Sequence, residues 1–213
     1  RYSAPLSGVS NSIKHFTEDN AREFHDRFFR PSNAIFFATG NIKPKVLREK
    51  IENVFGSWKG SVPEISADAI LPPEPKMLKI VIIDRPDLSQ AQVRIGHQGI
   101  GRTDSRRLAA SLMNLSFGGA GFSSRLMSRI RGREGLAYGV YSYFTLRRSP
   151  GPFVISTATR FSEVRRVVDL VLFEMERLKR EPPRGQELAS MKSLSTGRFS
   201  LRLETSSALL SSL

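Results

Sequence analysis

Cysteine is absent from the 213-residue sequence, and histidine occurs only three times. Without cysteine the chain can form no disulfide, no thiolate metal site and no cysteine nucleophile. His15 and His25 have no arrangement of carboxylates around them that would make them metal ligands. His97 shares a predicted strand face with Val93 and Ile95, which indicates a core or edge histidine. The residues by themselves therefore predict no metal site.

Long apolar runs are also missing from the sequence. No stretch approaches the roughly 20 apolar residues that a membrane-spanning helix requires, and no signal-type sequence opens the chain. We therefore expect no transmembrane segment. Because the chain starts abruptly at Arg1 and stops at Leu213 in helical-looking sequence, we expect a fragment cut at both ends.

Acidic residues are scarce relative to basic ones: 20 Asp and Glu oppose 33 Lys and Arg, for a formal net charge of +13. A charge of this size suits an anionic partner such as nucleic acid. The basic residues, however, are scattered among acids as singles and as the pairs 106–107, 147–148, 165–166 and 179–180. No nucleic-acid motif accompanies them, so we expect no nucleic-acid binding.

The order of helices and strands predicts an α+β chain with two units. Residues 63–76 belong to a proline-rich stretch without periodicity, which is typical of a linker between residues 1–62 and residues 77–213. In the first unit we expect a helix that Thr17 caps, a buried strand over 34–39, and a helix from Pro44 to a stop at Gly56. In the second we expect strands over 78–83, 91–97, 136–144 and 151–158, and helices over 104–115, 162–181 and from 185 onward.

The stretch 115–140 contains the candidate functional residues of the sequence. It begins with a glycine loop in which a sharp turn or a close approach of backbone is expected, formed by Gly118, Gly119 and Gly121. No Gly-Lys-Ser/Thr follows these glycines, so a phosphate-binding loop is not expected.

Arg131 and Tyr138 fall on two adjacent predicted elements of the same stretch, a helix and a strand. A guanidinium and a phenol brought together at such a corner can donate several hydrogen bonds to a carbonyl or an extended peptide. By themselves the residues favour a simpler interpretation, in which Arg131 is solvated and Tyr138 is a core residue whose hydroxyl reaches water.

Taken in order, these features resemble the pitrilysin or insulinase family of zinc peptidases, which includes bacterial and mitochondrial processing peptidases. The segments that carry the resemblance are 28–42, 54–58, 84–100, 118–126, 130–140 and 181–193. The resemblance implies two-layer α+β repeats, each an antiparallel sheet covered by helices on one face. Residues 1–62 would be the end of one repeat, and residues 77–213 most of the next, the so-called inactive domain.

The family's zinc motif, H-x-x-E-H, is absent from this sequence. None of its three histidines lies in such a motif, so we expect neither catalytic residues nor metal ligands in this fragment, which should be inactive alone. The resemblance implies zinc in the complete enzyme, either on other repeats of the same polypeptide or on a homologous zinc-bearing partner subunit.

Through the resemblance, Arg131 and Tyr138 fall on the arginine and tyrosine with which the family holds the substrate peptide opposite the zinc. The sequence departs from the family in one place: Gly132 stands where an acid usually follows the arginine, and Glu134 is displaced from it. The orientation of Arg131 is therefore open.

The glycine loop resembles the short bacterial form of a loop associated with substrate handling in the processing peptidase. We therefore expect the non-catalytic, substrate-binding portion of a bacterial zinc metalloendopeptidase that processes peptides or proteins. The alternative is a structural or assembly subunit that kept the fold without peptidase activity. Periplasm and cytoplasm are both open as its location.

Overall fold

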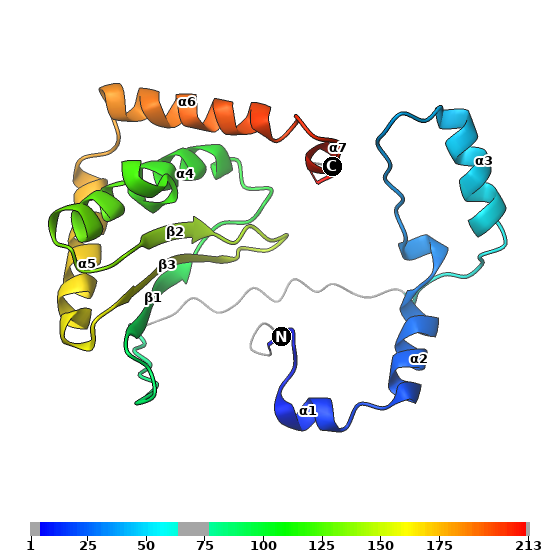
Figure 1. Ribbon diagram of the computed structural model, residues 1–213, viewed down its shortest axis with the longest axis horizontal. Helices are drawn as coiled ribbons and strands as arrows, with labels where there is room; N and C mark the ends of the chain where they lie inside the picture. The colour runs from blue at the N-terminus through cyan, green and yellow to red at the C-terminus, as the bar shows by residue number, and fades with distance from the viewer. Residues whose placement is uncertain (1–4, 64–76, 212–213) are drawn as a thin grey trace. The chain divides into compact units, whose positions relative to one another are not determined.

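The computed structural model describes residues 5–63 and 77–211 of the chain (Figure 1). The chain divides into two compact units, which consist of residues 1–68 with 202–213 and of residues 69–201. The predicted linker, residues 63–76, lies outside the described residues apart from Pro63. No described helix combines the length and the apolar character needed to cross a membrane.

The first unit is helical in its described residues, which form α1 (Ser10–Lys14), α2 (Glu18–Phe28), the 3₁₀ turn η1 (Pro31–Asn33), α3 (Pro44–Phe55) and α7 (Ser206–Leu210). The predicted N-cap of α2 is confirmed: the Thr17 hydroxyl accepts from Asn20 N, and the Asn20 side chain returns a bond to Thr17 N. The predicted bounds of α3 are also confirmed, because Gly56 N donates to Glu52 O as its C-cap.

The buried strand predicted over 34–39 is wrong. These residues form no strand, and Ile35, Phe36 and Phe37 are 79%, 59% and 51% exposed. A strand needs a neighbour for its N–H and C=O groups, and no described segment of the first unit pairs with this one. An apolar run of this length therefore did not suffice to predict a buried strand here.

The second unit contains an antiparallel sheet in the order β1 (Ala91–Gln98), β3 (Pro152–Thr159), β2 (Val140–Phe144). In register, Ala91 lies opposite Thr159 and Val140 opposite Thr157. The strands predicted over 91–97 and 151–158, and the hairpin that joins the last two strands, are confirmed. The loop 145–151 joins these two strands directly, so the consecutive strands pair antiparallel.

The helical layer consists of α4 (Arg107–Asn114), the π-helical turn η2 (Leu115–Gly119), the 3₁₀ turn η3 (Gly121–Ser123), the π-helical segment η4 (Met127–Arg133), the 3₁₀ turn η5 (Phe161–Glu163), α5 (Val164–Arg180) and α6 (Gly185–Leu201). In Figure 1, α4 lies above the sheet and α6 above α4. This mixture of helices with a small antiparallel sheet is the predicted fold class.

The core of the second unit joins the sheet to these helices. β3 alternates buried and half-exposed residues over most of its length, as expected for a strand with one covered face. Its buried residues meet side chains of η2, η4 and α5, among them Phe117, Ile130, Val167 and Val171. Two buried threonines are satisfied by backbone: Thr157 donates to Gly139 O and Thr159 to Leu136 O.

Two strand predictions in this unit are wrong. Residues 78–83 form no strand and are exposed, Ile82 by 88%, since no described segment offers them a pairing partner. The strand predicted over 136–144 begins only at Val140, because the carbonyls of Leu136 and Gly139 accept bonds from threonine side chains of β3.

Candidate substrate-binding site

The glycine loop packs η2 closely against β2. A Cβ on Gly118 would lie 2.8 Å from Ser142 N, and one on Gly119 would lie 2.8 Å from the Asn114 amide nitrogen, so neither position has room for a side chain. Gly121 instead has φ +58°, in the left-handed region that favours glycine. The loop is therefore shaped by two close approaches and one turn.

Asn114 and Ser142 connect the helical layer to the strand beneath this loop. Asn114 Nδ2 donates to Ser142 O at 3.0 Å, and Ser142 Oγ donates to Asn114 Oδ1 at 2.6 Å. Sequence reasoning missed this pair, which lies 28 residues apart. The glycine at 118 is the signal that could have indicated a close neighbour.

The segment η4 positions Arg131. Met127 and Ile130 anchor it in the core, and Leu136 N donates to Ile130 O at 2.9 Å as the chain leaves the helix. Gly135, with φ +62°, provides the turn that sends the chain toward β2. Tyr138 lies on this short connection, so Arg131 and Tyr138 approach each other across a single turn.

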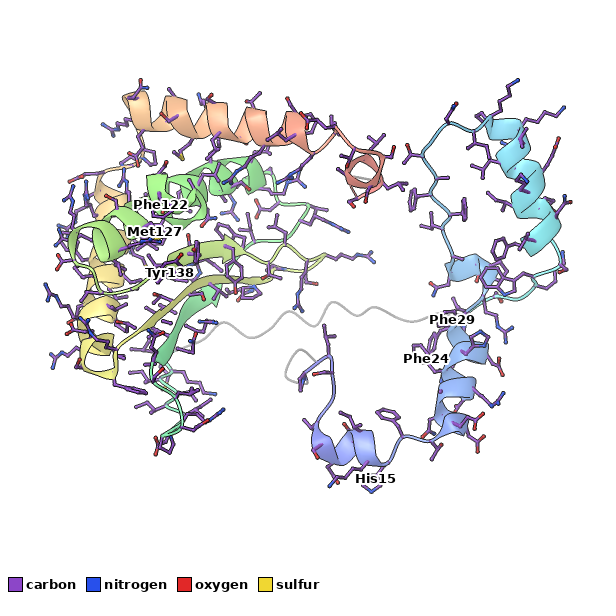
Figure 2. All side chains as sticks on the ribbon, viewed as in Figure 1. His15, Phe24, Phe29, Phe122, Met127 and Tyr138 are labelled. Carbon is purple, nitrogen blue, oxygen red and sulfur yellow. The ribbon has the colours of Figure 1, made fainter. Side chains whose placement is uncertain are left out.

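Arg131 lies against two exposed aromatic rings. Its Nη1 donates to Tyr138 O at 2.7 Å, and its guanidinium carbon is 4.4 Å from the centre of the Tyr138 ring and 4.5 Å from that of Phe122, within the range of cation–π attraction. Figure 2 labels Phe122 and Tyr138, which are 69% and 84% exposed. The interpretation of Tyr138 as a core residue is therefore wrong.

The displaced acid of this stretch does not bind Arg131. The Glu134 carboxylate instead accepts from Arg166 at 2.5 Å and lies 3.4 Å from Arg129. Among residues 5–63 and 77–211, Arg131 has no acidic partner and no other side-chain hydrogen bond than the one to Tyr138 O. Its orientation comes from a carbonyl and two rings, which leaves most of its five N–H donors available. Sequence reasoning missed Phe122, although it directly follows Gly121.

Arg125 and Glu187 join this stretch to the start of α6. Arg125 donates through Nε and Nη2 to the two Glu187 oxygens, both at 2.7 Å, and through Nη1 to Glu181 O at 2.8 Å. The Ser116 hydroxyl also donates to Glu187. Hydrogen bonding by Arg125 lowers the pKa of the Glu187 carboxyl, and Ser116 adds to this effect. The pair therefore connects the residues between η3 and η4 to the start of α6.

The histidines do not gather into a metal site. His15 Nδ1 lies 2.6 Å from Asn11 O, His25 stacks on Phe29, and His97 lies beside Phe153 with Nδ1 2.7 Å from Gln98 O. No cluster of three or more His, Cys, Asp or Glu that could hold a metal exists in the described part of the chain. The described residues therefore do not fit a catalytic zinc.

The matching family model is described as the peptidase M16 inactive domain and covers residues 15–194. An uncharacterized zinc protease of Streptomyces coelicolor is 28% identical over 211 residues, which cover 97% of this chain and 45% of that protein. The crystal structure of a peptidase M16 inactive domain from Pseudomonas fluorescens is 27% identical with a TM-score of 0.88, covering 99% of this chain and 50% of that one. A chain of complex III2 from Candida albicans has a TM-score of 0.78 at 19% identity, over 99% of this chain and 51% of that chain, and shows the fold alone.

Fold and site together define a two-layer α+β domain of the zinc-peptidase type that carries no metal cluster in its described residues. The chain belongs to the peptidase M16 family and contains its inactive domain. It spans about half the length of the curated relatives it matches.

Proposed function

We propose that this chain is the non-catalytic, substrate-binding portion of a zinc metalloendopeptidase. Arg131 and Tyr138 would hold the substrate peptide, while the zinc is supplied by other repeats of the same polypeptide or by a homologous partner subunit. The observation that carries the proposal is the exposed Tyr138 ring against an Arg131 that has no acidic partner in the described chain.

The chemistry follows from the donors of the two side chains. The Tyr138 hydroxyl can donate to a substrate carbonyl, and the Arg131 N–H groups that do not bind Tyr138 O can donate to the same oxygen or to a neighbouring one. Such donors stabilise negative charge that develops on the carbonyl oxygen during attack by water. Because the two rings hold the guanidinium in place, little side-chain freedom is lost when the peptide binds.

Peptide cleavage by the complete enzyme, or by the complex with its zinc-bearing subunit, tests the proposal. Tyr138→Phe and Arg131→Ala should each lower kcat/KM about 10²-fold, the usual loss for one such donor. The matched controls are Tyr143→Phe on β2 and Arg133→Ala on η4, both exposed, which should retain activity. Unchanged cleavage in the Tyr138 and Arg131 variants would exclude the proposed role.

A structural or assembly subunit is the second candidate function. The observation that favours it is the fold shared with a chain of complex III2. In that case the Tyr138 and Arg131 variants would leave any activity unchanged, whereas loss of this chain would prevent assembly of the complex, which size-exclusion chromatography would detect.

A further inference from the structure

Two loops of the second unit, together with the first residue of α4, bring five arginines together at one end of the sheet. One loop, residues 99–106, joins β1 to α4, and the other, residues 145–151, joins β2 to β3. The loops run side by side, because Gly99 N donates to Gly151 O and Arg102 N donates to Arg147 O, both at 2.7 Å. The basic cluster that results consists of Arg102, Arg106, Arg107, Arg147 and Arg148.

The basic cluster is strongly charged and faces solvent. All five arginines are exposed, and the only acid in 99–107 and 145–151 is Asp104, so the cluster carries a net charge of +4 (five minus one). The pairs 106–107 and 147–148 are far apart in the sequence, where the basic residues are scattered. In the fold these two pairs lie on neighbouring segments.

A carboxylate already lies in this cluster in the geometry that an arginine prefers. Asp104 accepts from Arg106 Nε at 3.0 Å and from Nη2 at 2.8 Å, a two-bond fork, and from Arg106 N at 2.8 Å. Hydrogen bonding by the Arg106 side chain lowers the pKa of Asp104 to about 2. Asp104 pairs with Arg106, and Arg107 Nη1 donates to Arg102 O at 3.2 Å. The two segments therefore hold more basic than acidic residues even with Asp104 included.

We propose that the basic cluster is a docking surface for an acidic segment of another polypeptide, whose Asp and Glu carboxylates bind the guanidinium forks. Carboxylates match the planar fork of arginine, as Asp104 illustrates. Nucleic acid fits less well, because residues 99–107 and 145–151 contain no aromatic side chain on which a base could stack. This inference does not depend on Arg131 or Tyr138.

Binding of three probes to the full chain at about 0.1 M salt, where the screening length is about 10 Å, tests the inference: a fluorescent peptide of alternating Asp and Ser, its Asn-and-Ser counterpart, and a single-stranded oligonucleotide of equal length. The variant R147E/R148E should raise the Kd of the acidic peptide about tenfold, since two attractions become repulsions. The control R180E/R184E removes the same charge at exposed positions beyond the cluster and should change Kd by less than about twofold, because salt screens distant charges. The neutral peptide should not bind.

Two results would overturn the inference. Equal weakening in both variants would mean that the overall charge of the chain attracts the peptide, and weakening confined to the oligonucleotide would identify a nucleic-acid surface. Circular dichroism checks that each variant is folded. If R147E/R148E is not, the neutral variant R147A/R148A replaces it, with an expected loss of about threefold.

Discussion

Two apolar segments of the second unit, β3 and residues 78–83, have opposite environments. Ile155 of β3 is 1% exposed, because strands flank it on both sides and side chains of the helical layer cover it. Residues 78–83 are more continuously apolar, yet Ile82 is 88% exposed, and no described segment pairs with them. Burial of an apolar segment here therefore depends on the backbone and side-chain neighbours that the fold offers it. An apolar sequence alone does not provide these neighbours.

The two units differ in the same way. No described residue of the first unit is buried, and its helices show mainly local contacts, such as the Phe24–Phe28 ring pair at 4.8 Å and the capping bonds of α2. The second unit has a contiguous core. Stability of the described chain should therefore reside mainly in the second unit.

The largest loss of stability is expected when a buried side chain of β3 is shortened. Ile155→Ala should lower the free energy of unfolding by about 3 kcal/mol, since it removes apolar contacts and leaves a cavity. Urea unfolding of the full chain, followed by circular dichroism, measures this difference. A loss below about 1 kcal/mol would contradict the packing described for β3.

The next largest loss of stability is expected at Gly118, which has no room for a side chain, whereas Gly132 has room. Gly118→Ala should cost about 2 kcal/mol, because its Cβ would collide with Ser142. Gly132→Ala is the matched control: its Cβ would meet only Met127 O at 3.9 Å, so it should be neutral or stabilise the chain by up to about 1 kcal/mol. Thermal melts of both variants test this, and equal shifts would contradict it.

A smaller effect is expected for the ion pair that joins the glycine stretch to α6. Glu187→Gln should cost about 1–2 kcal/mol near neutral pH, since the Glu187 side chain is partly exposed. The folded-state pKa of Glu187 is lowered from 4.5, so its contribution is complete above that pH and is lost as the pH falls through the folded pKa. Urea midpoints of parent and variant should converge in acid, and a constant difference would contradict this assignment.

The smallest effect should come from the exposed segment. Ile82→Lys should change the free energy of unfolding by less than about 0.5 kcal/mol, because the side chain loses almost no contacts. The same urea titration measures it beside Ile155→Ala. A large destabilisation by Ile82→Lys would show that residues 78–83 are packed in solution.

Local signals in the sequence were sufficient for several elements. Each of these signals involves residues within about one helical turn of the helix end that it marks. They are the cap at Thr17, the bounds of α3 at Pro44 and Gly56, and the start of α6 at Gly185. The strands β1 and β3 followed from short apolar runs beside turn residues. The proximity of Arg131 and Tyr138 was also predictable, because only seven positions separate them.

Other parts of the site required contacts between distant residues. The sequence did not predict the contact of Phe122 with Arg131, nor the pairs Asn114–Ser142 and Arg125–Glu187. The last two pairs are 28 and 62 residues apart, and Gly118 indicated a close neighbour without identifying it. The hydrogen bonds between the loops 99–106 and 145–151 also join residues that are distant in the sequence. The sequence by itself determined the family, the α+β class and the absence of the zinc motif. Tertiary structure decided which apolar runs are buried and which arginines meet, because both depend on neighbours that only folding brings within reach.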